Sequence, residues 1–180
     1  MKEDDLLNIP LSLAIFDFVP VIFFLITCTL VGLQLKKTNL TRSIFFLIGG
    51  FVTFVGGFLQ ALWKLMINIK EKNISALHSQ FKFTMPFGLL LMLFIIIISK
   101  NKINWKSVKS KLLSFPCIVF LILAIMFVTA LMTLLFVMKS NEVKYIWIKE
   151  SVNTALQASV CFCVLFSFIG KQSDSITNNN

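Results

Sequence analysis

The chain contains five long apolar blocks separated by short polar segments, and this pattern constrains its fold more than any other feature. A transmembrane helix needs about 20 consecutive, mostly apolar residues to cross the hydrocarbon core. Backbone N–H and C=O groups without hydrogen-bond partners are strongly unfavourable in hydrocarbon. A spanning block must therefore form a helix or part of a closed barrel. The sequence predicts an all-α, polytopic transmembrane helical bundle of about five spans. These spans cover residues 11–35, 43–69, 83–99, 115–138 and 146–170.

Length and composition agree with one membrane domain. The 180 residues are too few for two domains of ordinary size, and 57% of them are hydrophobic, which exceeds the roughly 45–50% of soluble domains. Residues 1–10 form an acidic N-terminal segment, and residues 171–180 form a polar tail that we expect to be disordered. Because the chain opens with acidic rather than basic residues, we do not expect a cleavable signal peptide.

The formal charge of +9 does not indicate a nucleic-acid partner, because the basic residues lie between the apolar blocks and not on one polar face. Basic residues in the loops between spans instead influence which side of the membrane each loop occupies. Nine Lys and Arg residues lie on the side of the C-terminus and seven on the side of the N-terminus, which is also acidic. This bias favours a plasma-membrane protein with its N-terminus outside and its C-terminus in the cytoplasm. Residues 100–111, with Trp105 among five lysines, are expected at the level of anionic headgroups.

Three ionisable residues lie inside the apolar blocks. At 1.5 Å per residue, Asp17 is about 9 Å inside the first block, Lys64 about 7–8 Å before the end of the second, and Glu150 about 6 Å inside the fifth. The alternation of the spans places all three in one leaflet, and the preferred topology makes it the outer one. A charge in hydrocarbon costs several kcal/mol unless it is paired or hydrated, so such residues suggest a functional site.

Polar residues also align along two of the predicted helices. On the second helix they form a stripe about 80° wide, and on the fifth a stripe about 100° wide. These residues are Gly49, Thr53, Gly56, Gln60 and Lys64 on the second helix, and Glu150, Asn153, Thr154, Gln157 and Cys161 on the fifth. Pro20 frees a backbone carbonyl near Asp17 on the first. We expect helices one, two and five to surround a polar centre, and helices three and four to face lipid.

Other residues have a structural and a functional interpretation. The pairs Gly49-Gly50 and Gly56-Gly57 favour close helix packing over close approach of a ligand. His78, the only histidine, could act as a lid or a proton-transfer group, or could simply be solvated in a loop. Trp63 could stack on a ligand, or could anchor the helix at the interface.

Several kinds of chemistry lack their sequence signature. The chain has no nucleophile elbow, no phosphate-binding glycine loop and no histidine-rich metal motif. All four cysteines lie within apolar blocks, without metal-ligand spacing, and are interpreted as small apolar residues. We therefore predict no cofactor, no metal site and no identifiable catalytic residue.

The polar constellation has two interpretations. In the first, a ligand site is formed by Asp17, Gln60, Trp63, Lys64, His78, Glu150, Asn153 and Gln157. In the second, Lys64 snorkels to the interface, Glu150 is a helix-end charge, and an Asp17–Lys64 pair joins two helices. The leading hypothesis is a polar intramembrane cavity that binds or transports a small polar or amphiphilic molecule. The alternatives are an intramembrane enzyme acting on a lipid or amphiphile, which is less favoured, and a subunit, sensor or immunity protein with a membrane-protein partner.

Overall fold

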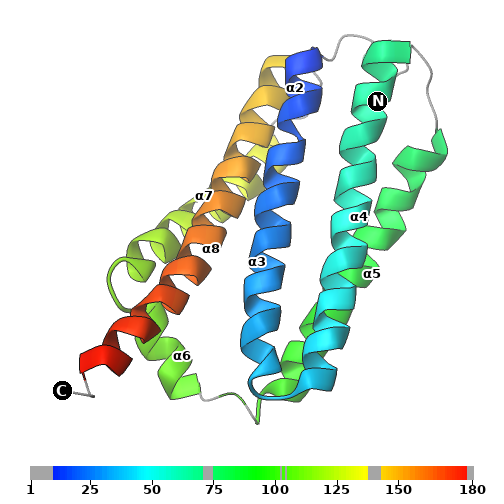
Figure 1. Cartoon of the computed structure of the whole chain (residues 1–180). Coiled ribbons are helices and arrows are strands. Elements are labelled where there is room, and N and C mark those ends of the chain that lie inside the picture. The colour runs from blue at the N-terminus through cyan, green and yellow to red at the C-terminus, as the bar shows by residue number, and fades with distance from the viewer. Residues whose placement is uncertain (1–9, 71–74, 102, 104, 138–142, 178–180) are drawn as a thin grey trace.

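The computed structural model describes residues 10–70, 75–101, 103, 105–137 and 143–177, and all regular secondary structure in these residues is helical (Figure 1). This confirms the predicted all-α fold class. The helices are α2 (Leu11–Phe16), α3 (Phe18–Lys36), α4 (Leu40–Lys70), α5 (Ser75–Ser99), α6 (Trp105–Leu112), α7 (Cys117–Val137) and α8 (Val143–Thr177).

Four helical segments of the described residues are long and apolar enough to cross a membrane, which makes the chain an integral membrane protein. They correspond to the first four predicted spans and cover Leu11–Lys36, Leu40–Ile69, Ser79–Ser99 and Cys117–Leu134. The fifth predicted block lies within α8, which carries more polar residues. Helix α8 continues to Thr177, so residues 171–177 are helical, whereas their polar sequence was expected to be disordered.

The first predicted span is interrupted at Asp17, where α2 ends and α3 begins. Pro20 accounts for this break. It has no N–H to donate to the carbonyl of Phe16 four residues earlier, and its ring crowds that carbonyl. Asp17 itself keeps helical backbone angles, with φ −59° and ψ −21°, so the two helices remain nearly in line. The break therefore adjusts the path of the first span without ending it.

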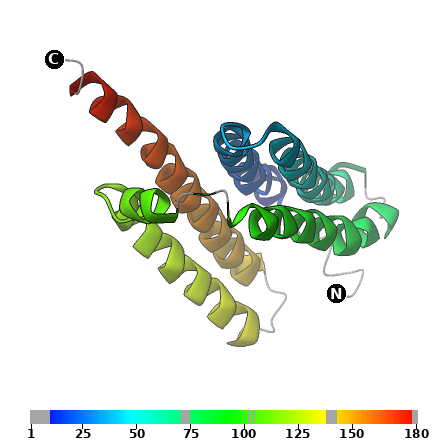
Figure 2. The same ribbon diagram turned by 90° about the horizontal axis from the view of Figure 1, so that it is seen from below.

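The helices form two groups, seen in Figure 2 from below. Helices α3, α4 and α5 make one group, with α4 in contact with both of the others, and α6, α7 and α8 make the second. Helix α3 also packs against α8 and so joins the two groups. In the described residues, α4 and α8 do not pack closely on each other, although both lie beside α3.

The glycine pairs of α4 lie at its two interfaces. The first glycine of each pair, Gly49 or Gly56, faces α5, and the second, Gly50 or Gly57, faces α3. Gly88 on α5 meets the Gly49 side of α4. Small residues let helix backbones approach each other closely in a membrane. The packing interpretation of these glycines agrees with the contacts.

Beyond the glycines, the end of the bundle near the α3–α4 turn is solidly packed. Leu35, Phe46 and Ile95 form a buried cluster there. The buried Ser43 hydroxyl donates a hydrogen bond of 2.7 Å to the carbonyl of Gly32 on α3. This end therefore contains both apolar packing and a bond between two helices.

Helices α5 and α7 are the most exposed of the four candidate spans. Only 11% of the most apolar stretch of each is buried, against 28% for the first span and 39% for α4. Their outer surfaces carry large apolar side chains such as Leu90, Phe94 and Met126. These surfaces suit contact with lipid, as expected for the third and fourth apolar blocks.

Candidate functional site

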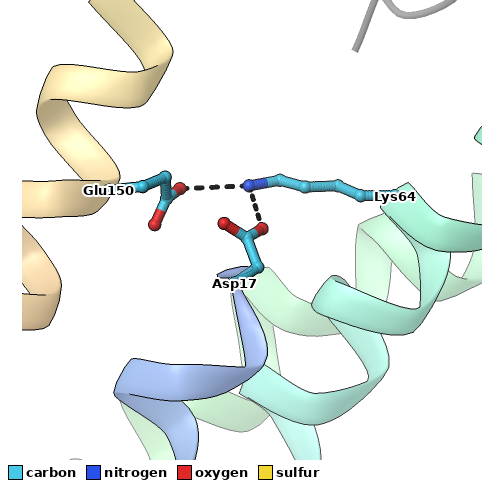
Figure 3. Close-up of polar contacts among 3 residues, drawn as sticks. All are labelled: Asp17, Lys64 and Glu150. Carbon is cyan, nitrogen blue, oxygen red and sulfur yellow. Dashed lines mark hydrogen bonds and ion pairs between the residues drawn. The ribbon is translucent and has the colours of Figure 1, made fainter. Parts of the chain in front are cut away.

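Lys64 lies between two carboxylates that come from different helices (Figure 3). Its ammonium pairs with Asp17 Oδ2 at the α2–α3 junction and donates a hydrogen bond of 3.0 Å to Glu150 Oε1 on α8. The side chains of Asp17 and Lys64 are 7% and 11% exposed, and that of Glu150 is 21% exposed. We call these three residues the ion triad. With all three groups ionised, the triad carries one net negative charge.

The ion triad lies at one depth in the bundle. Asp17 is six residues from the start of α2, Lys64 six from the end of α4, and Glu150 seven from the start of α8. At 1.5 Å per residue, each is about 9–11 Å from that end of its helix. The alternation of the helices, predicted from the sequence, accounts for this common depth.

Long side chains bridge the separation between α4 and α8 at this level. Helix α3 packs on both helices, and the extended Lys64 side chain reaches across to Glu150 (Figure 3). Charged groups in a low-dielectric setting need such partners, since an unpaired charge there is strongly unfavourable. The ion triad thus links α4 to α8 where helix packing does not.

A cavity of about 240 Å³ adjoins the ion triad. Its polar lining comes from the first span, α4 and α8, the three helical elements expected to surround a polar centre. The polar side chains in its wall are Asp17, Thr53, Gln60, Lys64, Glu150, Asn153 and Gln157. Six of the eight residues predicted from the sequence to form a ligand site are among them.

The rest of the cavity wall is apolar and partly aromatic. Phe24 on α3, Phe54 on α4, and Phe81 and Met85 on α5 contribute side chains to it. The participation of α5 was not anticipated, because its apolar sequence suggested only contact with lipid. Its small and hydroxyl residues Thr84 and Gly88 were the available signal, since they let α5 approach α4 closely.

One carboxylate oxygen of Asp17, a cavity-lining residue, accepts no hydrogen bond within the described part of the chain. Asp17 is only 6% exposed, and its Oδ1 atom is buried without a hydrogen bond from any described residue. Its other oxygen, Oδ2, is the one paired with Lys64. Buried polar atoms are nearly always hydrogen-bonded, so an orphaned carboxylate oxygen beside a cavity calls for an explanation.

An apolar cluster lies on the outer side of the ion triad, toward the nearer helix ends. Leu13, Trp63 and Ile67 are buried in it, and Ile146 and Trp147 pack against it. Most of these residues lie about one helical turn closer to the helix ends than the triad residue of the same span. The cluster separates the triad from the end of the bundle.

Two residues of the predicted ligand site are not placed in the cavity wall. Trp63 is 4% exposed and belongs to the apolar cluster, so it serves packing in this structure. The sequence pattern left open whether Trp63 stacks on a ligand or packs. Trp63 lies about 100° around the helix from Lys64, so the position of Lys64 alone does not place the Trp63 side chain. His78 was expected in a loop but falls in the first turn of α5, and its side chain lies outside the described part of the chain.

The described residues contain no group of three or more His, Cys, Asp or Glu side chains able to hold a metal ion. The carboxylates of the ion triad are instead held by Lys64. Chemically, the site offers two carboxylates around one ammonium, an unpartnered oxygen of Asp17, amide groups and aromatic rings. This combination suits noncovalent recognition of a small molecule.

The chain was compared with protein-family models, with curated proteins and with solved structures, and none of them matched.

Proposed function

We propose that this integral membrane protein binds, or carries across the bilayer, a small polar or amphiphilic molecule in the cavity beside the ion triad. The observation that carries the proposal is the position of the cavity. It adjoins three ionisable side chains from three separate helical elements, at one depth within an otherwise apolar bundle. Ligand sites are commonly concave and mostly apolar, with a few convergent polar groups.

The arrangement of the amides adds support. Gln60, Asn153 and Gln157 line the cavity from α4 and α8, along with Glu150. An ion triad that served only to join α4 and α8 would not require amide side chains beside it in the cavity wall. Burial of polar groups is unfavourable in lipid unless they find partners, and a bound polar molecule provides such partners.

Two neighbouring residues on α3 provide a matched test. Val21 lines the cavity, whereas Ile22 is 53% exposed on the outside of the bundle at nearly the same depth. Val21→Cys and Ile22→Cys would be made separately in a background in which the four native cysteines are alanine. Membrane-embedded protein would then be treated with small, hydrophilic thiosulfonate reagents, and the rate of modification measured.

We expect the cysteine at position 21 to react at least tenfold faster than the cysteine at position 22. Hydrophilic reagents do not dissolve in the hydrocarbon around the outer face, but they can reach a polar cavity. Equal, slow modification at both positions would mean that small polar solutes do not enter, and the proposal would be abandoned.

A further inference from the structure

We propose that the molecule taken by this cavity is a small organic cation, with an ammonium group for the ion triad and an apolar portion for the aromatic wall. This inference rests on the proposed function and specifies its ligand class. Its first support is the charge of the site. Two carboxylates share one ammonium, so with all three groups ionised the triad has one net negative charge, which a monovalent cation would balance.

The second support is the orphaned acceptor. Asp17 lines the cavity, and its Oδ1 atom is buried and accepts no hydrogen bond from the described residues. An ammonium N–H can donate to this oxygen, whereas a carboxylate or phosphate ligand cannot and would be repelled by it. A ligand that presents a charged donor would satisfy this oxygen and would also match the charge of the triad.

The third support is the aromatic part of the cavity wall. Phe24, Phe54 and Phe81 line the same cavity from three helices. Aromatic rings attract cations placed over their faces, and they also bury the apolar part of an amphiphile. A bare metal ion is a poor fit, because hard cations take six or more oxygen ligands, whereas the triad supplies two carboxylates, each with one oxygen paired with Lys64.

The size of the cavity limits the ligand. At about 240 Å³ it is smaller than the roughly 300–1,000 Å³ of sites for drug-sized molecules. Benzylammonium, benzyl alcohol and benzoate are suitable probes, because they share one ring and nearly one size but differ in charge. Their affinities would be measured by calorimetry on the whole protein in lipid nanodiscs, at neutral pH and low ionic strength.

We expect benzylammonium to bind at least tenfold more tightly than benzyl alcohol, and benzoate to bind most weakly. In Asp17→Asn and, separately, in Glu150→Gln, the affinity for benzylammonium should fall at least tenfold, while that for benzyl alcohol stays within about twofold. The neutral probe is thus the control for damage to the cavity in each variant. Two separate variants keep the test decisive if one of them does not fold.

The possible failures can be told apart. Equal affinities for benzylammonium and benzyl alcohol, or tighter binding of benzoate, would overturn the cation inference and leave the proposed function intact. Absence of binding by all three probes would also overturn the inference. The proposed function would fail with it only if the cysteine at position 21 were also unreactive.

Discussion

The two ends of α4 are built from the same helix and yet have opposite surroundings. Around Phe46 and Gly49 the helix lies tightly against α3 and α5, and a buried cluster fills the space between them. Around Gln60 and Lys64 it borders a cavity. Small side chains bring backbones together at one end, whereas a long charged side chain reaches across a separation at the other. Side-chain size and charge along α4 thus determine where the bundle is closely packed, around Phe46 and Gly49 (the solid end), and where it contains a cavity, around Gln60 and Lys64 (the hollow end).

This comparison predicts how each end responds to mutation. Stability at the solid end depends on contact distance, so added atoms should be costly there. Stability at the hollow end depends on charge balance, so lost charges should be costly and added methyl groups should be tolerated. The free energy of unfolding, measured by titration with a denaturing detergent in mixed micelles, tests each case.

The largest effect is expected from Lys64→Met, which removes the only cation of the ion triad. Two carboxylates would remain close together without a partner, and breaking a buried ion pair in this way costs about 3–5 kcal/mol. The triple variant Asp17→Asn, Lys64→Met and Glu150→Gln should regain most of that loss, because it leaves no charge behind. A triple variant no more stable than Lys64→Met would contradict the charge-balance account.

A smaller effect on stability is expected when alanine replaces a glycine at either end of α4. A Cβ at position 49 would be 2.9 Å from the carbonyl oxygen of Gly88, so Gly49→Ala should destabilise by about 1–3 kcal/mol. A Cβ at position 57 would meet only the side chain of Val21, at 3.3 Å, beside the cavity. Because alanine favours helix by about 0.8–1.0 kcal/mol over glycine, Gly57→Ala should be neutral or slightly stabilising.

Equal losses in these two variants would show that both ends are packed alike, and the contrast would be withdrawn.

The smallest effect concerns the hydrogen bond at the solid end. Ser43→Ala removes the donor to the Gly32 carbonyl and should destabilise by about 1 kcal/mol. Thr133→Ala is the control, because the Thr133 hydroxyl donates to the carbonyl of Thr129 within its own helix, the exposed α7. That variant should change stability by less than about 0.5 kcal/mol. A loss in Ser43→Ala no larger than in the control would mean that this bond does not help to hold α3 and α4 together.

The sequence predicted the features that depend on periodicity and length. The apolar blocks marked the helices, and the alternation of spans put Asp17, Lys64 and Glu150 at one depth. The stripe on the last helix, with Asn153 and Gln157, coincides with cavity-lining positions. These predictions required only the geometry of a helix and the spacing of residues in one sequence.

The aromatic wall could not be predicted in the same way. The chain has 20 phenylalanines, and only the tertiary arrangement selects Phe24, Phe54 and Phe81 for the cavity. The role of Trp63 depended on the rotation of α4 about its axis, which neighbouring residues do not reveal. Orientation in the membrane and the ligand-binding role of the site residues remain predictions.

The position of α3 between α4 and α8 has a consequence for how the molecule can respond to an occupant. Among the described residues, the ammonium of Lys64 ties α8 to α4 where the two helices themselves stand apart. An occupant that competes with this ammonium for Glu150 would remove this link between α4 and α8 and leave the packing of α3 on α8 to join the two helix groups. By thermodynamic linkage, whatever moves α8 away from α4 would then favour such an occupant to the same degree.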